Sequence, residues 1–340
     1  MDEIKALEPW KTDSFSIEAG ASGTYDELFA NGLMQVRITV SIEAHQLDTD
    51  TGSNVDYTIP PHEWGSLELQ LAGGRPLPAA WNASYTENDF VHQMPSGRSR
   101  PDQAETARQE MGDRRPGRGK LNFLDVWLTT TKVETQNLRA RIKDGSGEWV
   151  STEDSGNFST VTIKAHPPQE YTPAKLQIET DTDSGPWWIT YDGVPDPVEA
   201  KWHATIYYVY PGVYPLQKAN VSWTREDTQH PRMVLFAEDD GYAVATAAWN
   251  LGDPTKEIVQ YQKVYTGIAT LDYTADLTVN ERDGVPCFAH VRFDKSVPDL
   301  SEVYNLGEMW FQFWDIYGNQ GSFYPALSGD KNGIEFHIKT

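Results

Sequence analysis

Closely spaced acidic residues are the first side chains in this sequence that could do chemistry. Asp48, Asp50, Asn54 and Asp56 supply oxygens at every second or third position, and a similar DTDSG run occurs at 181–185. Alternating oxygens can bind calcium, but an EF-hand loop needs glycine at its sixth position and glutamate at its twelfth. Counted from Asp48, those positions hold serine and isoleucine. Both runs are therefore predicted to be solvated turns between strands, and no metal ligand is assigned.

Cys287 and His290 are the candidates for a thiol nucleophile and its base. In the run CFAHVRF, period-two alternation places these two side chains on opposite faces of a strand, so they cannot form a dyad. Cys287 is predicted to be a buried structural residue.

Other catalytic and metal-binding patterns are missing from the sequence. No two of the eight histidines have the HExxH spacing, no GxSxG elbow occurs, and RPGRGK lacks the spacing of a phosphate-binding loop. A glycosidase pair cannot be chosen among acids such as Glu238, Asp239 and Asp240, because the distance between two carboxyl groups in space defines it. We expect a protein without a metal or other cofactor and without catalytic activity. An unrecognised hydrolase is the alternative.

Aromatic residues are the more informative candidates, since the chain has 12 tryptophans and 16 tyrosines. In EMWFQFWDIY, methionine and two phenylalanines alternate with Trp310, Gln312 and Trp314. A strand that is apolar on both faces is either covered twice or presents one face to a partner. Trp310 and Trp314 would lie about 13 Å apart along the strand. This spacing could stack sugar rings or anchor a protein interface.

The run WHATIYYVYPGVYP has a similar character. Trp202, Tyr208 and Tyr210 fall on one face of the expected strand and Tyr207 on the other. The first three join Trp310 and Trp314 as candidate binding residues. The competing interpretation is a large aromatic core between sheets, in which none of them is accessible.

Residues 93–120 form a basic segment within an acidic chain. The segment has seven Arg or Lys against four Asp or Glu, and it contains no large aliphatic or aromatic side chain, whereas the whole chain has a net charge of −22. Such a segment buries too little apolar surface to offset its ordering entropy, so a long mobile loop between two strands is expected. Arginines of this loop could contact an acidic face of the same chain or of a second copy of it. The candidates for this contact are Arg98, Arg100, Arg114, Arg115 and Arg118. A mobile insertion without a partner is the alternative.

The elements that must position these residues are mostly strands. Val36, Ile38, Val40 and Ile42 alternate with polar residues, and many further short runs share this period of two, separated by Gly-, Pro- and Asp-rich turns. Only the opening residues and PDQAETARQEM favour helix. The sequence thus predicts an all-β protein of two tandem antiparallel β-sandwiches, immunoglobulin-like or jelly-roll-like, covering residues 1–170 and 171–340. The three prolines in HPPQEYTPAK mark the linker between them.

Composition excludes several classes of protein. A net charge of −22 repels nucleic acid, and no apolar run is long enough to predict a membrane-spanning helix. One cysteine allows no disulfide within the chain. The acidic start MDEIKALEPW does not resemble a signal peptide, so we expect cytoplasmic synthesis, with signal-independent release as a further possibility.

These observations favour a non-catalytic soluble protein that acts by binding or self-association through aromatic surface, with itself or a glycan as partner. A carbohydrate-binding, lectin-like protein is the first alternative. A released effector made without a signal peptide, such as an insect-active toxin, is the second.

Overall fold

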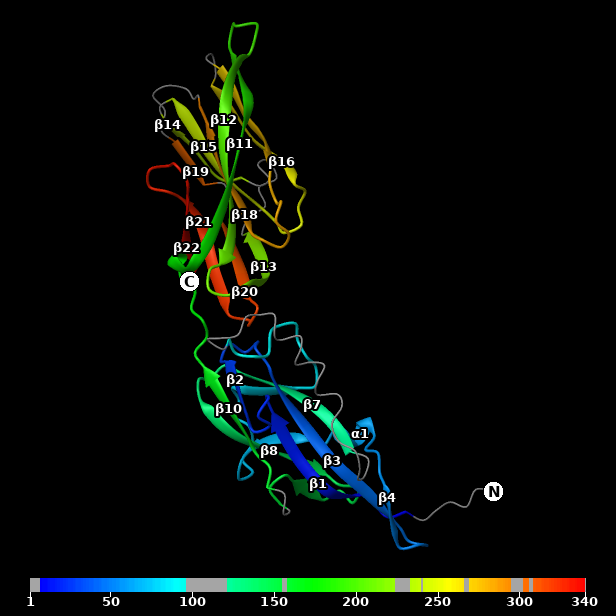
Figure 1. The fold of residues 1–340 in the computed structure, drawn as a ribbon. Coiled ribbons are helices and arrows are strands. Elements are labelled where there is room, and N and C mark those ends of the chain that lie inside the picture. Colours follow the sequence, from blue (N-terminus) through cyan, green and yellow to red (C-terminus); the bar gives the residue numbers. More distant parts are fainter. Residues whose placement is uncertain are drawn as a thin grey trace, which may run out of the picture. The chain divides into compact units, whose positions relative to one another are not determined.

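The computed structural model describes residues 7–95, 121–154, 158–223, 233–239, 241–265, 269–294, 302–305 and 308–339. Strands dominate these residues, and helix within them is confined to α1 (Pro61–Trp64) and the 3-10 helix η2 (Pro173–Lys175). The predicted all-β, sandwich-like fold is confirmed. Of the two stretches expected to be helical, PDQAETARQEM and residues 1–6 of the opening lie outside the described residues, and residues 7–10 form no helix. Two compact units divide the chain, Met1–Pro168 and Gln169–Thr340 (Figure 1).

The first unit contains two five-stranded sheets. Sheet A has the order β1 (Lys11–Ala19), β3 (Val36–Asp48), β7 (Leu121–Thr130) and β6 (Trp81–Ser84), with β4 (Ser53–Asp56) paired to β3. Sheet B has the order β2 (Tyr25–Phe29), β10 (Val161–His166), β8 (Thr135–Lys143) and β5 (Glu68–Leu71), with β9 (Trp149–Ser151) paired to β8. The β2–β10 pair is parallel, and the other strand pairs of these two sheets are antiparallel.

Alternation in β3 produces the core of this unit. Val36, Ile38, Val40 and Ile42 are fully buried, as predicted, while the residues between them are exposed or half-buried. Strand β1 of sheet A contacts β2, β8 and β10 of sheet B, so the apolar faces of the two sheets pack against each other.

The first acidic run forms the tight turn between β3 and β4. The buried Asp48 accepts hydrogen bonds through Oδ1 from the backbone N–H groups of Asp50 and Thr51, at 2.9 and 3.2 Å. Its carboxylate therefore supports the turn in the way that aspartate commonly does. No group of three or more potential metal-ligating side chains occurs among the described residues.

The basic segment connects neighbours within one sheet. Strands β6 and β7, which precede and follow it, pair antiparallel from Trp81 opposite Thr130 to Ser84 opposite Trp127. Residues 96–120, with all five arginines proposed for a partner loop, lie outside the described residues.

The second unit contains an eight-stranded sheet and a four-stranded sheet, both antiparallel. Sheet C has the order β16 (Lys256–Tyr265), β17 (Ala269–Thr278), β11 (Leu176–Tyr191), β12 (Val198–Pro211), β18 (Cys287–Phe293), β15 (Tyr242–Trp249), β14 (Met233–Asp239) and β19 (Glu302–Asn305). Sheet D has the order β13 (Leu216–Trp223), β20 (Met309–Asp315), β21 (Gln320–Leu327) and β22 (Ile334–Ile338).

Sheet C curls over its own apolar face. Phe236 of β14 and Tyr261 of β16 belong to opposite ends of the strand order, yet their rings stack with centroids 4.1 Å apart. Tyr273 of β17 also donates a hydrogen bond of 2.8 Å to the buried carboxylate of Glu238 on β14. The curl encloses a large aromatic core within this one sheet.

Sheet D covers part of the other face of sheet C and creates a second core. Phe288 of β18 contacts the rings of Phe311 and Phe336, with centroid distances of 5.2 and 5.3 Å. Strands such as β18 are thus covered on both sides over part of their length, which explains why nearly every side chain of CFAHVRF is buried.

The second acidic run lies inside a strand, which corrects the predicted turn. DTDSG belongs to β11, which pairs with β12 along a long hairpin, green in Figure 1. Gly185 stands directly opposite Trp202, and a Cβ at this position would lie 2.8 Å from the indole Cζ2. The glycine therefore makes room for a tryptophan and does not form a turn.

Gly185→Ala is expected to lower the free energy of unfolding by about 1–3 kcal/mol, because the added methyl overpacks the indole of Trp202. Urea unfolding curves measure this loss. Ser184→Ala, at the exposed neighbouring position, is the matched control and should change stability by less than about 0.5 kcal/mol. Equal stability of the two variants would contradict the packing role of Gly185.

Candidate functional site

The alternating pattern of β20 creates an outward row of aromatic residues on sheet D. Met309, Phe311 and Phe313 are buried, as the alternation predicts, and Phe313 contacts Phe323 and Tyr171 with ring centroids 5.9 and 4.9 Å apart. The intervening side chains of β20 are half-buried and point away from this core. Trp310 and Trp314 are therefore accessible from solvent, as a binding role for them requires.

Neighbouring strands place polar side chains beside these indoles. Residues directly opposite one another in an antiparallel pair point to the same face. On β13, Ser222 lies opposite Trp310, and Asn220 lies opposite Gln312. On β21, Gln320 lies opposite Trp314. The Gln312 amide thus lies between the two indoles, and the hydroxyl of Ser222 and the amide of Gln320 lie beside them.

We call this surface the outer face of sheet D. Its residues come from all four strands and from the residue that follows β22, and they are half-buried or exposed: Lys218, Asn220, Ser222, Trp310, Gln312, Trp314, Gln320, Ser322, Tyr324, His337 and Lys339.

Two lysines lie over the tryptophan rings. The Lys218 ammonium is 4.8 Å from the centroid of Trp314, and the Lys339 ammonium is 5.1 Å from that of Trp310. Such cation–π contacts at exposed sites contribute about 0.5–1 kcal/mol, so a ligand can displace the flexible lysine side chains at modest cost. Each half-buried indole therefore has one lysine ammonium over its ring.

Two further rings of this face stack on each other. The rings of Tyr324 and His337 stack 5.3 Å apart on the neighbouring strands β21 and β22. The outer face of sheet D therefore combines flat aromatic rings with amides, hydroxyls and two cations. A ligand with apolar ring faces and a polar rim complements this combination.

Trp202 and Tyr208 are core residues, which corrects their prediction as binding residues. They are 3% and 0% exposed and belong to the core enclosed by sheet C. Tyr210 is partly buried against the same core. Strand β12 has hydrogen-bonded neighbours on both sides, and the curl of sheet C covers the face that carries these rings. For Trp202 and Tyr208, the structure therefore agrees with the alternative interpretation of a large aromatic core.

Cys287 and His290 point to opposite sides of sheet C. Cys287 is buried in the core of that sheet, and burial raises the pKa of its thiol to about 11. His290 lies on the other face of β18 and lines a groove there. The predicted absence of a Cys–His dyad agrees with this placement.

Sequence reasoning missed the amides of Asn220 and Gln320 and the two lysines beside Trp310 and Trp314. ANVSW is recognisable as a strand, but nothing in it shows that it pairs with β20 in the register that brings Asn220 beside Gln312. Register between strands far apart in sequence depends on the whole sheet.

No protein-family model matches this chain, and a search of the curated proteins found no match either. Within the described residues, no helix combines the length and apolar character needed to cross a membrane.

Proposed function

We propose that this chain is a non-catalytic binding protein whose outer face of sheet D recognises an extended glycan. One observation carries the proposal: Trp310 and Trp314 lie on one open sheet face with the amide of Gln312 between them. The two indoles are about 13 Å apart along the strand, so they can stack on separate sugar rings of one chain.

The polar groups of the face support a glycan in particular. The apolar C–H face of a sugar ring packs on an indole, while its hydroxyls donate and accept hydrogen bonds at the rim. Asn220, Gln312 and Gln320 carry amides that do both. A face that buried itself against another protein would have to desolvate these amides, which costs free energy wherever a partner group is missing.

Self-association through the same face is the second candidate, because tryptophan is enriched at the centres of protein interfaces. The two candidates differ in one measurable respect. Glycan binding leaves the chain monomeric, whereas self-association makes its apparent mass depend on protein concentration.

A glycan array probed with the full chain is the test. Wild-type protein is expected to bind a set of extended glycans, and Trp310→Ala or Trp314→Ala should each weaken binding about tenfold, or 1.4 kcal/mol, because each removes one stacking platform. Trp149→Ala is the matched control: Trp149 is also exposed, and the Arg141 guanidinium lies 4.0 Å from its ring, but it belongs to sheet B. It should bind like the wild type.

Light scattering at several concentrations completes the test. The wild type could bind no glycan on the array but associate at high concentration, with both Trp310→Ala and Trp314→Ala abolishing the association. That result would identify a second copy of the chain, and not a glycan, as the partner of this face. Binding that survives both substitutions would contradict the assignment of this face.

A further inference from the structure

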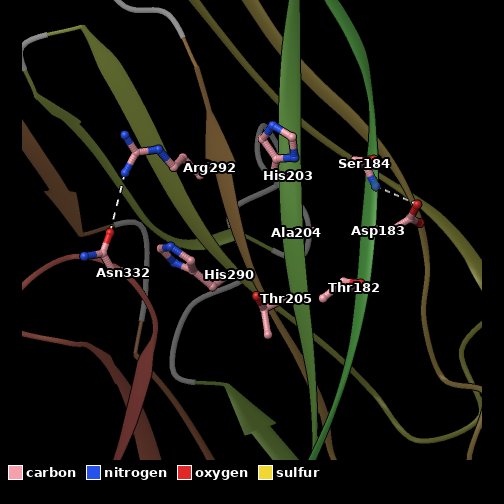
Figure 2. Close-up of a pocket in the computed structure, with 9 residues that line it drawn as sticks. All are labelled: Thr182, Asp183, Ser184, His203, Ala204, Thr205, His290, Arg292 and Asn332. Atoms are coloured by element: carbon pink, nitrogen blue, oxygen red, sulfur yellow. Dashed lines mark hydrogen bonds between the residues drawn. The ribbon is translucent and has the colours of Figure 1, made fainter.

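A second candidate site lies on the face of sheet C that sheet D partly covers. It is a groove of about 420 Å³, lined by residues of β11, β12, β18 and the turn between β21 and β22 (Figure 2). His290 lies two residues beyond Phe288 on β18, on the same side of the strand, so the groove begins close to where the core beneath sheet D ends. Its volume falls in the range of small-molecule sites, about 300–1,000 Å³.

One residue that lines the groove is a buried histidine with an unsatisfied ring nitrogen. His290 is 5% exposed, and its buried Nδ1 has no hydrogen-bond partner among the described residues. Thr246 on β15 stands directly opposite His290, and its buried Oγ1 also has no hydrogen-bond partner among the described residues. A buried polar atom without a partner costs about 1–3 kcal/mol, and His290 is the one of these two residues that lines the groove. Its unsatisfied nitrogen favours a group that enters the groove and bonds to the ring.

Hydroxyl groups extend from His290 along the groove. Thr205 stands opposite His290 on the other neighbouring strand, β12, so a row of Thr205, His290 and Thr246 crosses the sheet. Thr182 and Ser184 add two more hydroxyls from β11, as Figure 2 shows. Hydroxyls and a neutral imidazole both donate and accept hydrogen bonds.

The charges around the groove do not favour an anion. Arg292 is a cation at its edge, but the Arg292 Nε lies 4.0 Å from Asp294, which also contacts His203 Nε2 at 3.1 Å. Asp183 adds a carboxylate that accepts the backbone N–H of Thr278. Burial, followed by the nearby Arg292, lowers the pKa of His290 to about 4 despite an opposing effect of Asp330, so its ring is neutral near pH 7.

We propose that this groove binds a small neutral polyhydroxylated molecule, a monosaccharide or a polyol, with one hydroxyl seated against the His290 ring. A neutral ligand whose hydroxyls both donate and accept matches the Thr205 hydroxyl and the His290 ring nitrogens. The guanidinium of Arg292, held 4.1 Å above the Tyr242 ring and 3.5 Å from the Asn332 amide oxygen, supplies further N–H donors at the rim. The site uses none of the residues of the outer face of sheet D, so it does not depend on the proposed glycan function.

The test is a titration of full-length protein that carries isotope-labelled histidine, followed through the ring signals of His290. The probes are glucose, galactose and mannose for sugars, glycerol and sorbitol for polyols, and acetate and inorganic phosphate for anions. At least one sugar or polyol is expected to shift the His290 signals in a saturable manner. Comparing the sugars with the polyols shows which of these two kinds of ligand the groove binds.

Thr205→Val provides the decisive variant, because it removes a hydroxyl opposite His290 and keeps the shape of a half-exposed residue. It should weaken the binding at least tenfold. The double variant Trp310→Ala/Trp314→Ala should bind in this groove like the wild type, which separates this site from the glycan face. The proposal is overturned if no sugar or polyol shifts His290 up to tens of millimolar, if only acetate or phosphate does so, or if Thr205→Val binds equally well.

Discussion

Asp315→Ala is expected to lower the free energy of unfolding of the second unit by about 3–5 kcal/mol, because four hydrogen-bond donors lose the acceptor that they share. Asp315 is 0% exposed and is the last residue of β20, the strand that carries both tryptophans. Its Oδ1 accepts the backbone N–H groups of Tyr317 and Asn319 at 2.8 and 2.9 Å. Its Oδ2 accepts the Tyr171 hydroxyl and the Asn319 side-chain amide at 2.8 and 2.9 Å.

Chemical denaturation of the full chain, followed by circular dichroism, measures the loss. Asp330→Ala is the matched control, since Asp330 also accepts bonds within a hairpin turn, from Ser328 and Asn332, but is exposed. Asp330→Ala should destabilise the protein far less than Asp315→Ala does. Asp315→Asn retains one carbonyl oxygen, so its loss of stability should lie between those of Asp315→Ala and Asp330→Ala. A loss below about 1 kcal/mol for Asp315→Ala would mean that these bonds contribute little to stability.

Acidification from pH 6.5 to pH 4 is expected to destabilise the protein through His290. Burial lowers the pKa of this ring from 6.5 to about 4 in the folded chain. Because the folded state disfavours the charged ring, the stabilisation by neutral His290 is complete above pH 6.5 and is lost as the pH falls toward 4. A pKa lowered to this extent corresponds to about 3 kcal/mol.

The measurement compares the unfolding free energy of wild-type protein and His290→Phe at pH 7.5 and pH 4.5. The difference between the two proteins isolates His290, because other groups also titrate as the pH falls. Burial raises the pKa of Asp26 to about 6 and also raises that of Asp315, whereas hydrogen bonds lower the pKa of Glu27 and of Asp181. His337→Gln, at an exposed position of the same unit, should reproduce the wild-type values at both pH values. A wild-type pH dependence that His290→Phe leaves unchanged would contradict the prediction.

Local alternation predicted those strands whose two faces differ in polarity. In β3, the apolar residues of the alternating pattern are the buried ones. In β20, which is apolar on both faces, alternation separated Met309, Phe311 and Phe313 from the two tryptophans, and the first three are the buried ones. The same rule shows which side chains share a face but not which face is covered. Alternation correctly placed Trp202 and Tyr208 on the same face of their strand. Their burial, however, follows from the curl of sheet C, which brings β14 against β16. That contact joins strands from opposite ends of the sheet and leaves no local signal.

Strand β11 shows a different limit of sequence reasoning. Its DTDSG run has a composition typical of turns, but pairing with β12 along the hairpin makes it a strand. The groove at His290 was not predicted because its residues come from three strands and one turn. Alternation did establish that Cys287 and His290 lie on opposite faces, but it gave no sign that the side of His290 is only partly covered by sheet D.

The central claim is that a glycan contacts Trp310 and Trp314 on the outer face of sheet D. Fluorine NMR of protein labelled with 5-fluorotryptophan tests it most directly, since the signals of these two residues can be assigned from Trp310→Phe and Trp314→Phe. Adding a glycan that binds on the array is expected to shift these two signals and to leave those of the buried Trp187 and Trp202 unchanged. Binding that shifts the signal of Trp149 or Trp188, which are exposed elsewhere, while Trp310 and Trp314 stay unchanged would contradict the claim.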